Sequence, residues 1–294
     1  MLTVQALGFG VVSAALIAIG AMGFTLQFGL TNVLNISYGG AMTAGAFAAF
    51  IAAEWHLPPA VGVVFALLAG ALLTWLLGRT LFAFYARRGA GVFEMVMVTL
   101  AVSLIIQFGI DAASHEQIYR FSFPQGASLR WGWFAFTVTQ LVLVAVAVAV
   151  YTGLELLLRR TKLGKALRAM ADQPRLARTC GIPTGKIVNV VWLLSGALAG
   201  LAGLAYVINS LTIDASVGTT FLPLVLAAAI LGKAGSTRGA VLAALLLGLV
   251  TEEVSAWGGA PYASVAGFGI LAIVLATRPA ALAGQAAGKT EITV

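Results

Sequence analysis

The stretch from Ala6 to Phe28, ALGFGVVSAALIAIGAMGFTLQF, contains no charged side chain. An α-helix needs about 20 apolar residues to cross a bilayer, and this run is long enough. Comparable runs follow at about Ala41 to Ala53, Pro59 to Gly78, Met95 to Ile110, Phe134 to Leu154, Asn189 to Ile208, Phe221 to Gly232, Gly239 to Ala256 and Pro261 to Thr277. The sequence therefore predicts an all-α, polytopic helical membrane bundle of about eight or nine transmembrane helices.

The composition supports the same class. Of the 294 residues, 61% are hydrophobic and only 9% are charged, whereas an ordinary soluble domain has about 25% charged residues. The mean hydropathy is +1.01. A soluble enzyme of this length is excluded because too few polar residues remain to cover its surface. We expect one membrane-spanning domain over residues 1–294.

The basic residues are concentrated in a few connections. Eight of the seventeen Lys and Arg residues lie between Arg159 and Lys186. This clustering indicates a cytoplasmic loop that follows the positive-inside rule, and it argues against a nucleic-acid groove. Other basic residues follow the third and seventh runs and occupy the polar tail at 279–294. We expect these segments to be cytoplasmic too, with the N-terminus outside and the C-terminus cytoplasmic.

Two of the apolar runs, 41–53 and 221–232, are too short to cross the membrane as straight helices. Each follows a stretch rich in Asn, Ser, Thr and Gly, at 31–40 and 209–220. Such backbone is tolerated at membrane depth only where it is buried in protein or lines a watery cavity. A pair of short, interrupted segments predicts a transporter pathway. The alternative is that both stretches are ordinary loops outside the bilayer.

Candidate residues of the translocation pathway lie in the first interrupted stretch: Asn32, Asn35, Ser37, Tyr38 and Gly39. They offer hydrogen-bonding groups without a fixed charge, which suits transient hydrogen bonding along a pathway. The alternative is that Asn and Ser only satisfy backbone groups freed by the break. Glu252 and Glu253 lie near the outer interface, where a structural role is favoured over an intramembrane functional one.

Small residues are expected to mediate helix packing in the sixth run. Gly196 and Gly200 form a small-x-x-x-small surface, which Gly203 continues. Such surfaces let two membrane helices approach closely.

The hydrophilic segment 159–186 shows a pattern of its own. Leu167 and Met170 fall on one side of a helix predicted from Lys165 to Asp172. Pro174 suits the start of a second short helix, ended by Gly181 and Pro183. Two short helices against the bundle would form a docking surface. The alternative is a solvated basic loop that only sets the topology.

No cofactor and no metal site is expected, because the chain has one cysteine, Cys180, and two histidines. The same scarcity argues against a membrane-embedded enzyme. The closest approximation to a nucleotide-binding loop, at 284–290, lacks the required spacing. Energy for transport must therefore come from a partner.

The stretch from Arg160 to Thr184 contains Arg-Thr-x-x-Gly-x-Ala-x-Arg-Ala, followed by Asp, Leu-Ala and Gly-Ile-x-Thr. This stretch resembles the coupling loop of LivH-type permeases, the membrane subunits of branched-chain amino-acid ABC importers. Three further stretches resemble the same family in the same order: 29–39, 195–203 and 231–240.

The resemblance implies a multi-pass permease of the bacterial inner membrane, and it implies the partners. A second permease subunit, LivM-like or a second copy, would complete the pathway, and a periplasmic binding protein would deliver substrate. Two cytoplasmic ATPase subunits would dock on the loop, through Arg168, Ala169, Asp172, Leu176, Ala177, Gly181 and Ile182.

Two departures from the family pattern bear on the substrate and on gating: Tyr38 replaces a common His, and Lys233 replaces a common Gly. The same family with urea, short amides or other small carboxylates as substrate is the main alternative. An ion-coupled secondary transporter is a weaker one, because it is expected to carry acidic residues in the middle of a span.

Overall fold

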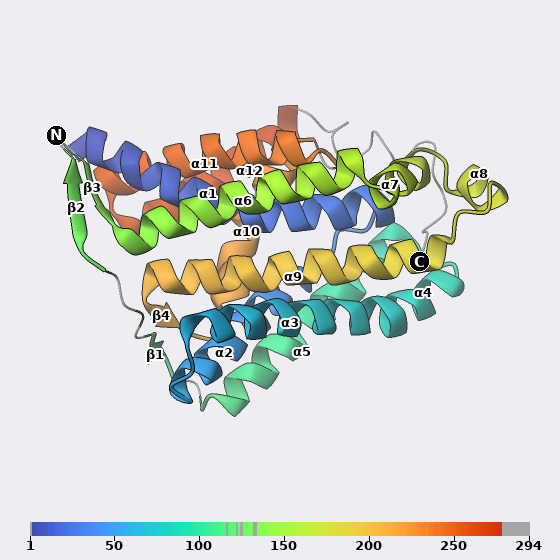
Figure 1. Cartoon of the computed structure of the whole chain (residues 1–294), viewed down its shortest axis with the longest axis horizontal. Coiled ribbons are helices and arrows are strands. Elements are labelled where there is room, and N and C mark those ends of the chain that lie inside the picture. The colour runs from blue at the N-terminus through green and yellow to red at the C-terminus, as the bar shows by residue number, and fades with distance from the viewer. Residues whose placement is uncertain are drawn as a thin grey trace.

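The structure is a computed structural model that describes residues 2–277 except 116, 122, 124, 125, 132, 133 and 234. The predicted polar tail at 279–294 lies outside the described residues. The long helices are α1 (Leu2–Thr31), α2 (Tyr38–Glu54), α3 (Pro59–Leu77), α5 (Val92–Ala113), α6 (Val138–Arg160), α9 (Thr184–Ser210), α10 (Val217–Leu231), α11 (Thr237–Gly258) and α12 (Ala260–Thr277). The predicted polytopic helical bundle is confirmed (Figure 1).

Six helical stretches among the described residues are long and apolar enough to cross a membrane. They include α3, which continues through the short π-helix η1 (Gly78–Phe82) into α4 (Ala83–Arg87). The two runs predicted to be short form α2, with 17 residues, and α10, with 15 residues. Both are shorter than a full membrane-crossing helix of about 20 residues.

Short strands, absent from the all-α prediction, connect the helices at one end of the bundle (Figure 1). β1 (Tyr119–Arg120) pairs antiparallel with β4 (Thr212–Ile213), and β2 (Ser128–Trp131) pairs antiparallel with β3 (Phe134–Thr137). The fifth apolar run therefore begins as a strand. Its helix starts one residue after Thr137, whose Oγ1 accepts a hydrogen bond from the Gln140 N–H and caps α6.

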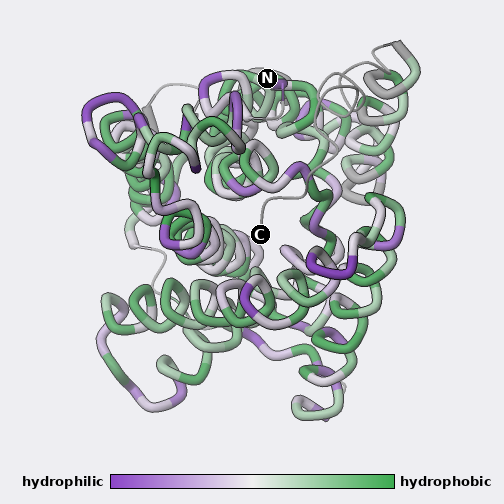
Figure 2. The backbone as a smooth tube through the Cα atoms, turned by 90° about the vertical axis from the view of Figure 1, so that its right-hand side faces the viewer, coloured by the Kyte–Doolittle hydropathy of each residue, from purple (hydrophilic) through white to green (hydrophobic). Residues whose placement is uncertain are grey.

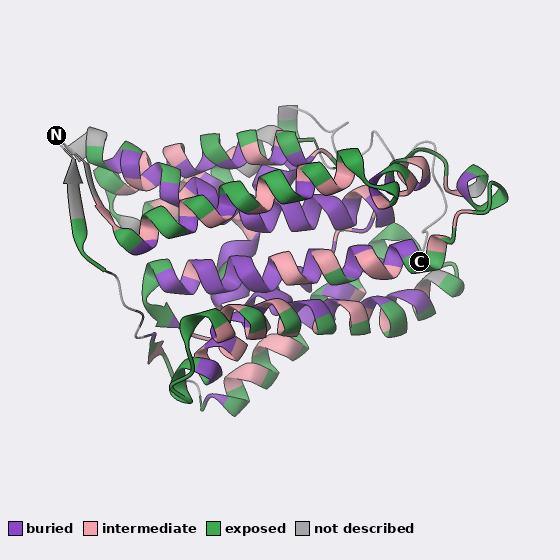
Figure 3. Ribbon diagram, viewed as in Figure 1, coloured by how far each residue is buried: buried purple, intermediate pink, exposed green. Residues whose placement is uncertain are grey.

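The core lies along α1 and α9, which are the most continuously buried helices in Figure 3. α9 packs against α1, α2 and α3, and α1 packs against α6, α10 and α11. Glycines bring these backbones together. A Cβ atom at Gly196 would lie 2.3 Å from the Gly70 carbonyl oxygen, one at Gly200 2.0 Å from the Ala66 oxygen, and one at Gly203 2.1 Å from the Met42 oxygen. These three glycines thus lie where α2 and α3 approach α9 most closely.

The two ends of the bundle differ in charge. The ribbons β1–β4 and β2–β3 lie at one end, and α7 (Lys162–Asp172) and α8 (Pro174–Thr179) lie at the other (Figure 1). Hydrophilic turns face the viewer in Figure 2, which looks onto the α7–α8 end. The spans alternate in direction, and this end therefore receives Arg79 of η1, Arg159 at the end of α6, Lys233 after α10 and Arg238 at the start of α11. This separation of charge follows the pattern expected from the positive-inside rule.

Candidate functional site

The first interruption of the bundle lies between α1 and α2. α1 ends at Thr31, whose Oγ1 donates to the Gln27 carbonyl at 2.9 Å. Asn32 then adopts a left-handed conformation with φ of +54°, which Asn tolerates better than most residues. Irregular backbone follows until α2 begins at Tyr38. The break predicted at 31–40 is therefore real but shorter, because helical structure extends into it from both sides.

The five candidate pathway residues lie mostly inside the protein. Asn35, Ser37 and Tyr38 are at most 1% exposed, Gly39 is buried, and Asn32 is partly buried. The Ser37 Oγ donates to Asn35 Oδ1 at 2.5 Å, and the Tyr38 hydroxyl donates to the Gly20 carbonyl at 2.9 Å. The first bond lies within the break, and the second attaches the start of α2 to the middle of α1. The role of the five residues in a pathway stays a prediction.

A polar stripe on α5, missed by the sequence reasoning, contacts the same break. Thr99 Oγ1 accepts a hydrogen bond from the Ile36 N–H at 3.2 Å and lies 3.3 Å from the Leu34 oxygen. Ser103 and Gln107 follow Thr99 at four-residue spacing, so all three share one face of the helix. That spacing within an apolar span was the signal that could have identified them.

Two buried polar atoms in this region have no hydrogen-bond partner among the described residues: Asn35 Nδ2 and Ser103 Oγ. A buried donor without a partner costs roughly 1–3 kcal/mol. Thr99 joins the two segments that carry these atoms. Water or a polar solute that reached this region would relieve the cost.

The second interruption separates α9 from α10. Leu211 ends α9 with φ of +59°, and β4 follows directly. Asp214 Oδ1 then accepts hydrogen bonds from the Ser216 N–H at 2.7 Å and the Ser216 hydroxyl at 2.6 Å, which organises the turn before α10. As in the first break, the irregular backbone is shorter than the predicted stretch at 209–220.

The N-terminal turns of α2 and α10 meet inside the bundle. The Gly218 N–H donates to Thr43 Oγ1 at 2.9 Å. A Cβ atom at Gly218 would lie 1.8 Å from the Gly39 carbonyl oxygen, and one at Gly39 would lie 2.9 Å from the Gly218 oxygen. Only glycine fits at such a contact. The two short helices thus bring their positive dipole ends together without a charged side chain in either first turn.

The predicted coupling segment folds as two short helices, as expected. The Thr161 hydroxyl caps α7 by accepting from the Gly164 N–H at 3.1 Å. Leu167, Met170 and Ala177 are buried against the bundle, whereas Leu176 is 57% exposed on α8. Gly181 has φ of +79°, and the Ile182 N–H donates to the Ala177 carbonyl at 3.1 Å, which ends α8.

The predicted ATPase contacts therefore divide into two groups. Arg168 and Asp172 are exposed and line a cavity between α7 and the ends of α1 and α6. Ala169 and Ile182 are partly buried against the bundle. Exposed Leu176, together with the turn at Gly181, is available at the tip of the segment. Their role in docking an ATPase stays a prediction.

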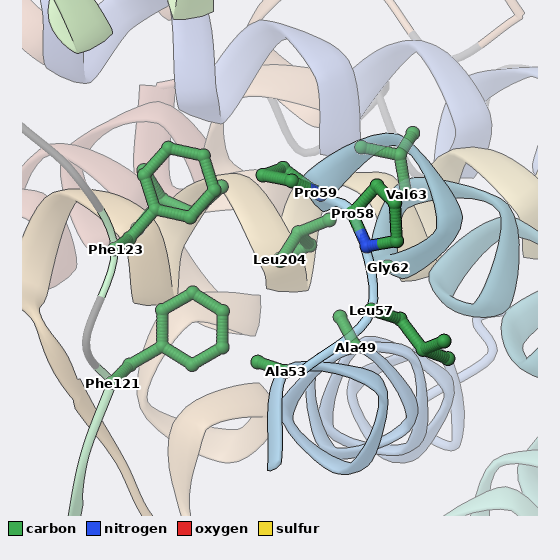
Figure 4. A pocket seen from close by; sticks show the side chains of 11 residues that line it. Ala49, Ala53, Leu57, Pro58, Pro59, Gly62, Val63, Phe121, Phe123 and Leu204 are labelled. Carbon is green, nitrogen blue, oxygen red and sulfur yellow. The ribbon is translucent and has the colours of Figure 1, made fainter. Parts of the chain in front are cut away.

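The opposite end holds an apolar cavity of about 190 Å³. Phe121 and Phe123 face the side chains of Leu57, Pro59 and Leu204 across it (Figure 4). Among the described residues, those that line this cavity carry no charge. The paired helix ends, which offer a dipole potential, are the better candidate site.

Glu252 and Glu253 lie at this same end of the bundle and not in the middle of a span. The Ser13 hydroxyl of α1 donates to Glu252 Oε1, so Glu252 joins α11 to α1. Glu252 and Glu253 are both partly exposed in the last two turns of α11. This placement agrees with the structural interpretation favoured above.

Comparison with known proteins identifies the family. The model of the branched-chain amino acid transport system / permease component family matches residues 6–276. The chain is 30% identical to a probable branched-chain amino acid transport permease protein LivH of Methanocaldococcus jannaschii, over 81% of this chain and 77% of that protein. It is 25% identical to the high-affinity branched-chain amino acid transport permease BraD of Pseudomonas aeruginosa, over 96% of this chain and 95% of the relative.

More distant similarity extends beyond amino-acid transport. The ribose import permease protein RbsC of Escherichia coli is 26% identical over 83% of this chain and 76% of its own length. The solved structure of PsaBC from Streptococcus pneumoniae in complex with Fab aligns with a TM-score of 0.50 at 13% identity, covering 92% of this chain and 91% of that one. That likeness supports the fold alone. From its family match and its apolar helices, this chain belongs to the branched-chain amino acid transport permease family, whose members are membrane transport subunits.

Proposed function

We propose that this chain is the translocating subunit of an ATP-driven importer for branched-chain or related hydrophobic amino acids. The observation that carries the proposal is the meeting of two short helices, α2 and α10, at Gly39 and Gly218. Discontinuous helices whose N-termini point at one place provide a favourable potential for a substrate carboxylate without a fixed cation. A zwitterion can therefore be attracted there and still leave.

In this conformation, the contact between the first turns of α2 and α10 is closed. The Gly218 N–H is occupied by Thr43, and the Tyr38 and Gly39 N–H groups bond to Asn35 and Ile36 carbonyls. Admission of substrate requires these first turns to move apart. The unpaired Asn35 Nδ2 and Ser103 Oγ would then offer hydrogen bonds beside the opened contact.

The energy for that movement would come from a partner through α7 and α8. α7 is attached to the bundle by buried Leu167 and Met170, while α8 presents Leu176 outward. A displacement of these helices would therefore be transmitted to the cytoplasmic ends of α1 and α6, which pack against α7. We infer that two ABC ATPase subunits dock here.

The remaining partners and the orientation follow from the same proposal. The basic α7–α8 end would face the cytoplasm in a bacterial inner membrane, with the N-terminus outside. A binding protein would deliver substrate to the ribbon end, and a second permease subunit, LivM-like or a second copy, would complete the pathway.

A second candidate is a related importer for a different polar solute. The similarity to a ribose permease supports this second candidate. The aromatic side chain of Tyr38 beside the break supports it as well. Urea, short amides and small carboxylates belong to this alternative. An ion-coupled mechanism is less favoured, because Asp214 at the second break already accepts two hydrogen bonds from Ser216, and the other described acidic residues lie near the ends of the helices.

The experiment that tests the proposal is uptake by the purified complex in proteoliposomes. The permease is isolated with the ATPase and binding-protein chains that copurify with it, and uptake of radiolabelled L-leucine, ribose and urea is compared. We expect L-leucine uptake that requires ATP and ceases with an ATPase subunit unable to hydrolyse it. Uptake of ribose or urea alone would select the second candidate. Uptake driven by a proton gradient without ATP would overturn the ABC mechanism.

A further inference from the structure

A crevice runs along the outside of the bundle where α6 and α11 flank α1. Its middle part is an apolar groove of about 150 Å³ lined by side chains from all three helices, including Ala18, Met22, Val148, Tyr151, Val241 and Leu245. Val148 is 59% exposed and Leu245 is 44% exposed. The groove is therefore open to the surface that faces lipid in a membrane protein.

A larger cavity of about 500 Å³ continues the groove toward the α7–α8 end. On each of the three helices, a residue that lines the groove is about one turn from a residue that lines the cavity. These pairs are Met22 and Leu26 on α1, Tyr151 and Glu155 on α6, and Val241 and Arg238 on α11. Residues about one turn apart on a helix lie on the same face. The groove and the cavity are thus consecutive parts of one crevice, apolar along the span and polar at its basic end.

The polar part carries an excess of positive charge. Four cationic side chains line it, against the two carboxylates of Glu155 and Asp172; the cations are Arg159, Arg168, Lys233 and Arg238. Glu155 Oε1 accepts from the Nε of Arg159 and, at 2.8 Å, from the Nε of Arg238. An arginine that uses its Nε for one carboxylate can bind a second anion through its terminal nitrogens.

Two further features of the cavity point to a ligand. Thr25 is one of the lining residues, and its buried Oγ1 has no hydrogen-bond partner among the described residues. Lys233 is held in a left-handed conformation with φ of +66°, which glycine adopts freely and other residues adopt at a cost. Lys233 and the two arginines that share the Glu155 carboxylate supply the donors that an anionic oxygen ligand would need.

We propose that this crevice binds an anionic phospholipid of the leaflet at the α7–α8 end. The acyl chain occupies the apolar groove, and the phosphate lies among Lys233, Arg159 and Arg238. A free inorganic anion would use only the polar half, whereas a phospholipid uses both. Basic pockets at membrane depth that continue into apolar grooves recognise such headgroups. The site is independent of the solute that the permease carries.

The proposed lipid would also contact the coupling segment. Arg168 and Asp172 of α7 line the headgroup end, opposite the α10–α11 connection that carries Lys233. A phospholipid there would lie between α7 and the bundle. Its headgroup would join α7 to the start of α11.

The test compares lipid retention by native mass spectrometry of the complex carrying this chain. Phosphatidylglycerol and phosphatidylcholine with identical acyl chains are added in turn, and we expect selective retention of phosphatidylglycerol. Lys233→Gly should reduce its apparent affinity about fivefold, and Lys233→Gly with Arg238→Gln about thirtyfold, since each cation near a membrane surface contributes a factor of this size. Lys165→Gln, which removes an exposed charge of α7 outside the cavity, should leave retention unchanged.

The apolar half is tested separately. Val144 lines the groove, whereas its neighbour Ala145 does not, so Val144→Trp should displace the lipid and Ala145→Trp should not. Equal retention of phosphatidylglycerol and phosphatidylcholine by the unsubstituted protein would show that the bound lipid is ordinary boundary lipid, and it would overturn the proposal. Displacement of phosphatidylglycerol by inorganic phosphate, combined with no effect of Val144→Trp, would instead assign a small-anion site.

Discussion

The contact between α2 and α10 can be tested by adding a single methyl group. In Gly218→Ala, the new Cβ atom would lie 1.8 Å from the Gly39 oxygen, 2.5 Å from its carbonyl carbon and 2.6 Å from Thr43 Oγ1. Ordinary van der Waals contact begins near 3.4 Å. The two helix ends must therefore separate by about 1.6 Å, which a close-packed interior resists.

The cost follows from the same geometry. Overpacking of this kind costs about 1–3 kcal/mol, and loss of the hydrogen bond from the Gly218 N–H to Thr43 costs about 0.5–1.5 kcal/mol. We therefore expect a destabilisation of roughly 2–4 kcal/mol. Because the ends would be held apart, uptake should also lose its normal dependence on ATP.

The assay pairs thermal unfolding of the purified protein in detergent with uptake per folded molecule. Gly153→Ala is the matched control, because a Cβ atom at Gly153 in α6 would meet nothing within 4 Å. Replacing glycine in a helix interior at an open position stabilises by about 0.5–1 kcal/mol. Gly39→Ala, at 2.9 Å from the Gly218 oxygen, should be milder than Gly218→Ala. Equal unfolding temperature and uptake of Gly218→Ala and Gly153→Ala would show that α2 and α10 are not closely packed at this contact.

Three further substitutions test the neighbouring features. Tyr38→Phe removes the hydrogen bond to the Gly20 carbonyl and should cost about 0.5–1.5 kcal/mol in a melting experiment; an altered substrate preference at unchanged stability would assign Tyr38 to the pathway rather than to packing. Thr99→Val leaves the Ile36 N–H without its partner in a part-buried position and should cost about 1–3 kcal/mol, whereas Thr152→Val on the exposed face of α6 should be near neutral; equal melting of the two variants would contradict the role given to Thr99. Gly181→Ala places a side chain at φ of +79° and should cost about 1–2 kcal/mol and weaken substrate-stimulated ATP hydrolysis; hydrolysis as strongly stimulated as in the unsubstituted complex would show that the turn after α8 does not couple.

Much of the architecture was accessible from the sequence because it depends on local composition. The run from Ala6 to Phe28 forms part of α1, and the pattern around Leu167 and Met170 forms the amphipathic α7. Both features follow from where apolar side chains fall within one helix. The two interruptions were also predicted, because their Asn, Ser and Gly content departs from that of the adjacent helices.

What the sequence left open depends on contacts between distant segments. Gly39 and Gly218 lie on different helices, and no local pattern indicates that their backbones touch. The spacing of Thr99, Ser103 and Gln107 indicates a polar face on α5, but it does not indicate that the Thr99 hydroxyl bonds the Ile36 N–H. The ribbons were missed because strands as short as β1 and β4 are stabilised by pairing rather than by their own sequence.

The burial of the candidate pathway residues could also not be predicted from the sequence. Polar residues at a helix break can line a cavity or satisfy the backbone, and composition does not distinguish the two. The structure places Ser37 and Tyr38 within hydrogen bonds of the closed arrangement. A pathway role for them therefore requires the movement of the first turns proposed above.

The claim that ATP-driven movement enters through the α7–α8 end can be tested most directly on the natural cysteine. Cys180 is exposed immediately after α8, and the chain has one cysteine. A membrane-impermeant maleimide should label Cys180 in inverted vesicles and not in right-side-out vesicles, and bound ATPase subunits should reduce the labelling rate. Labelling from the outside, or a rate in inverted vesicles that is unchanged by the ATPase, would contradict the account.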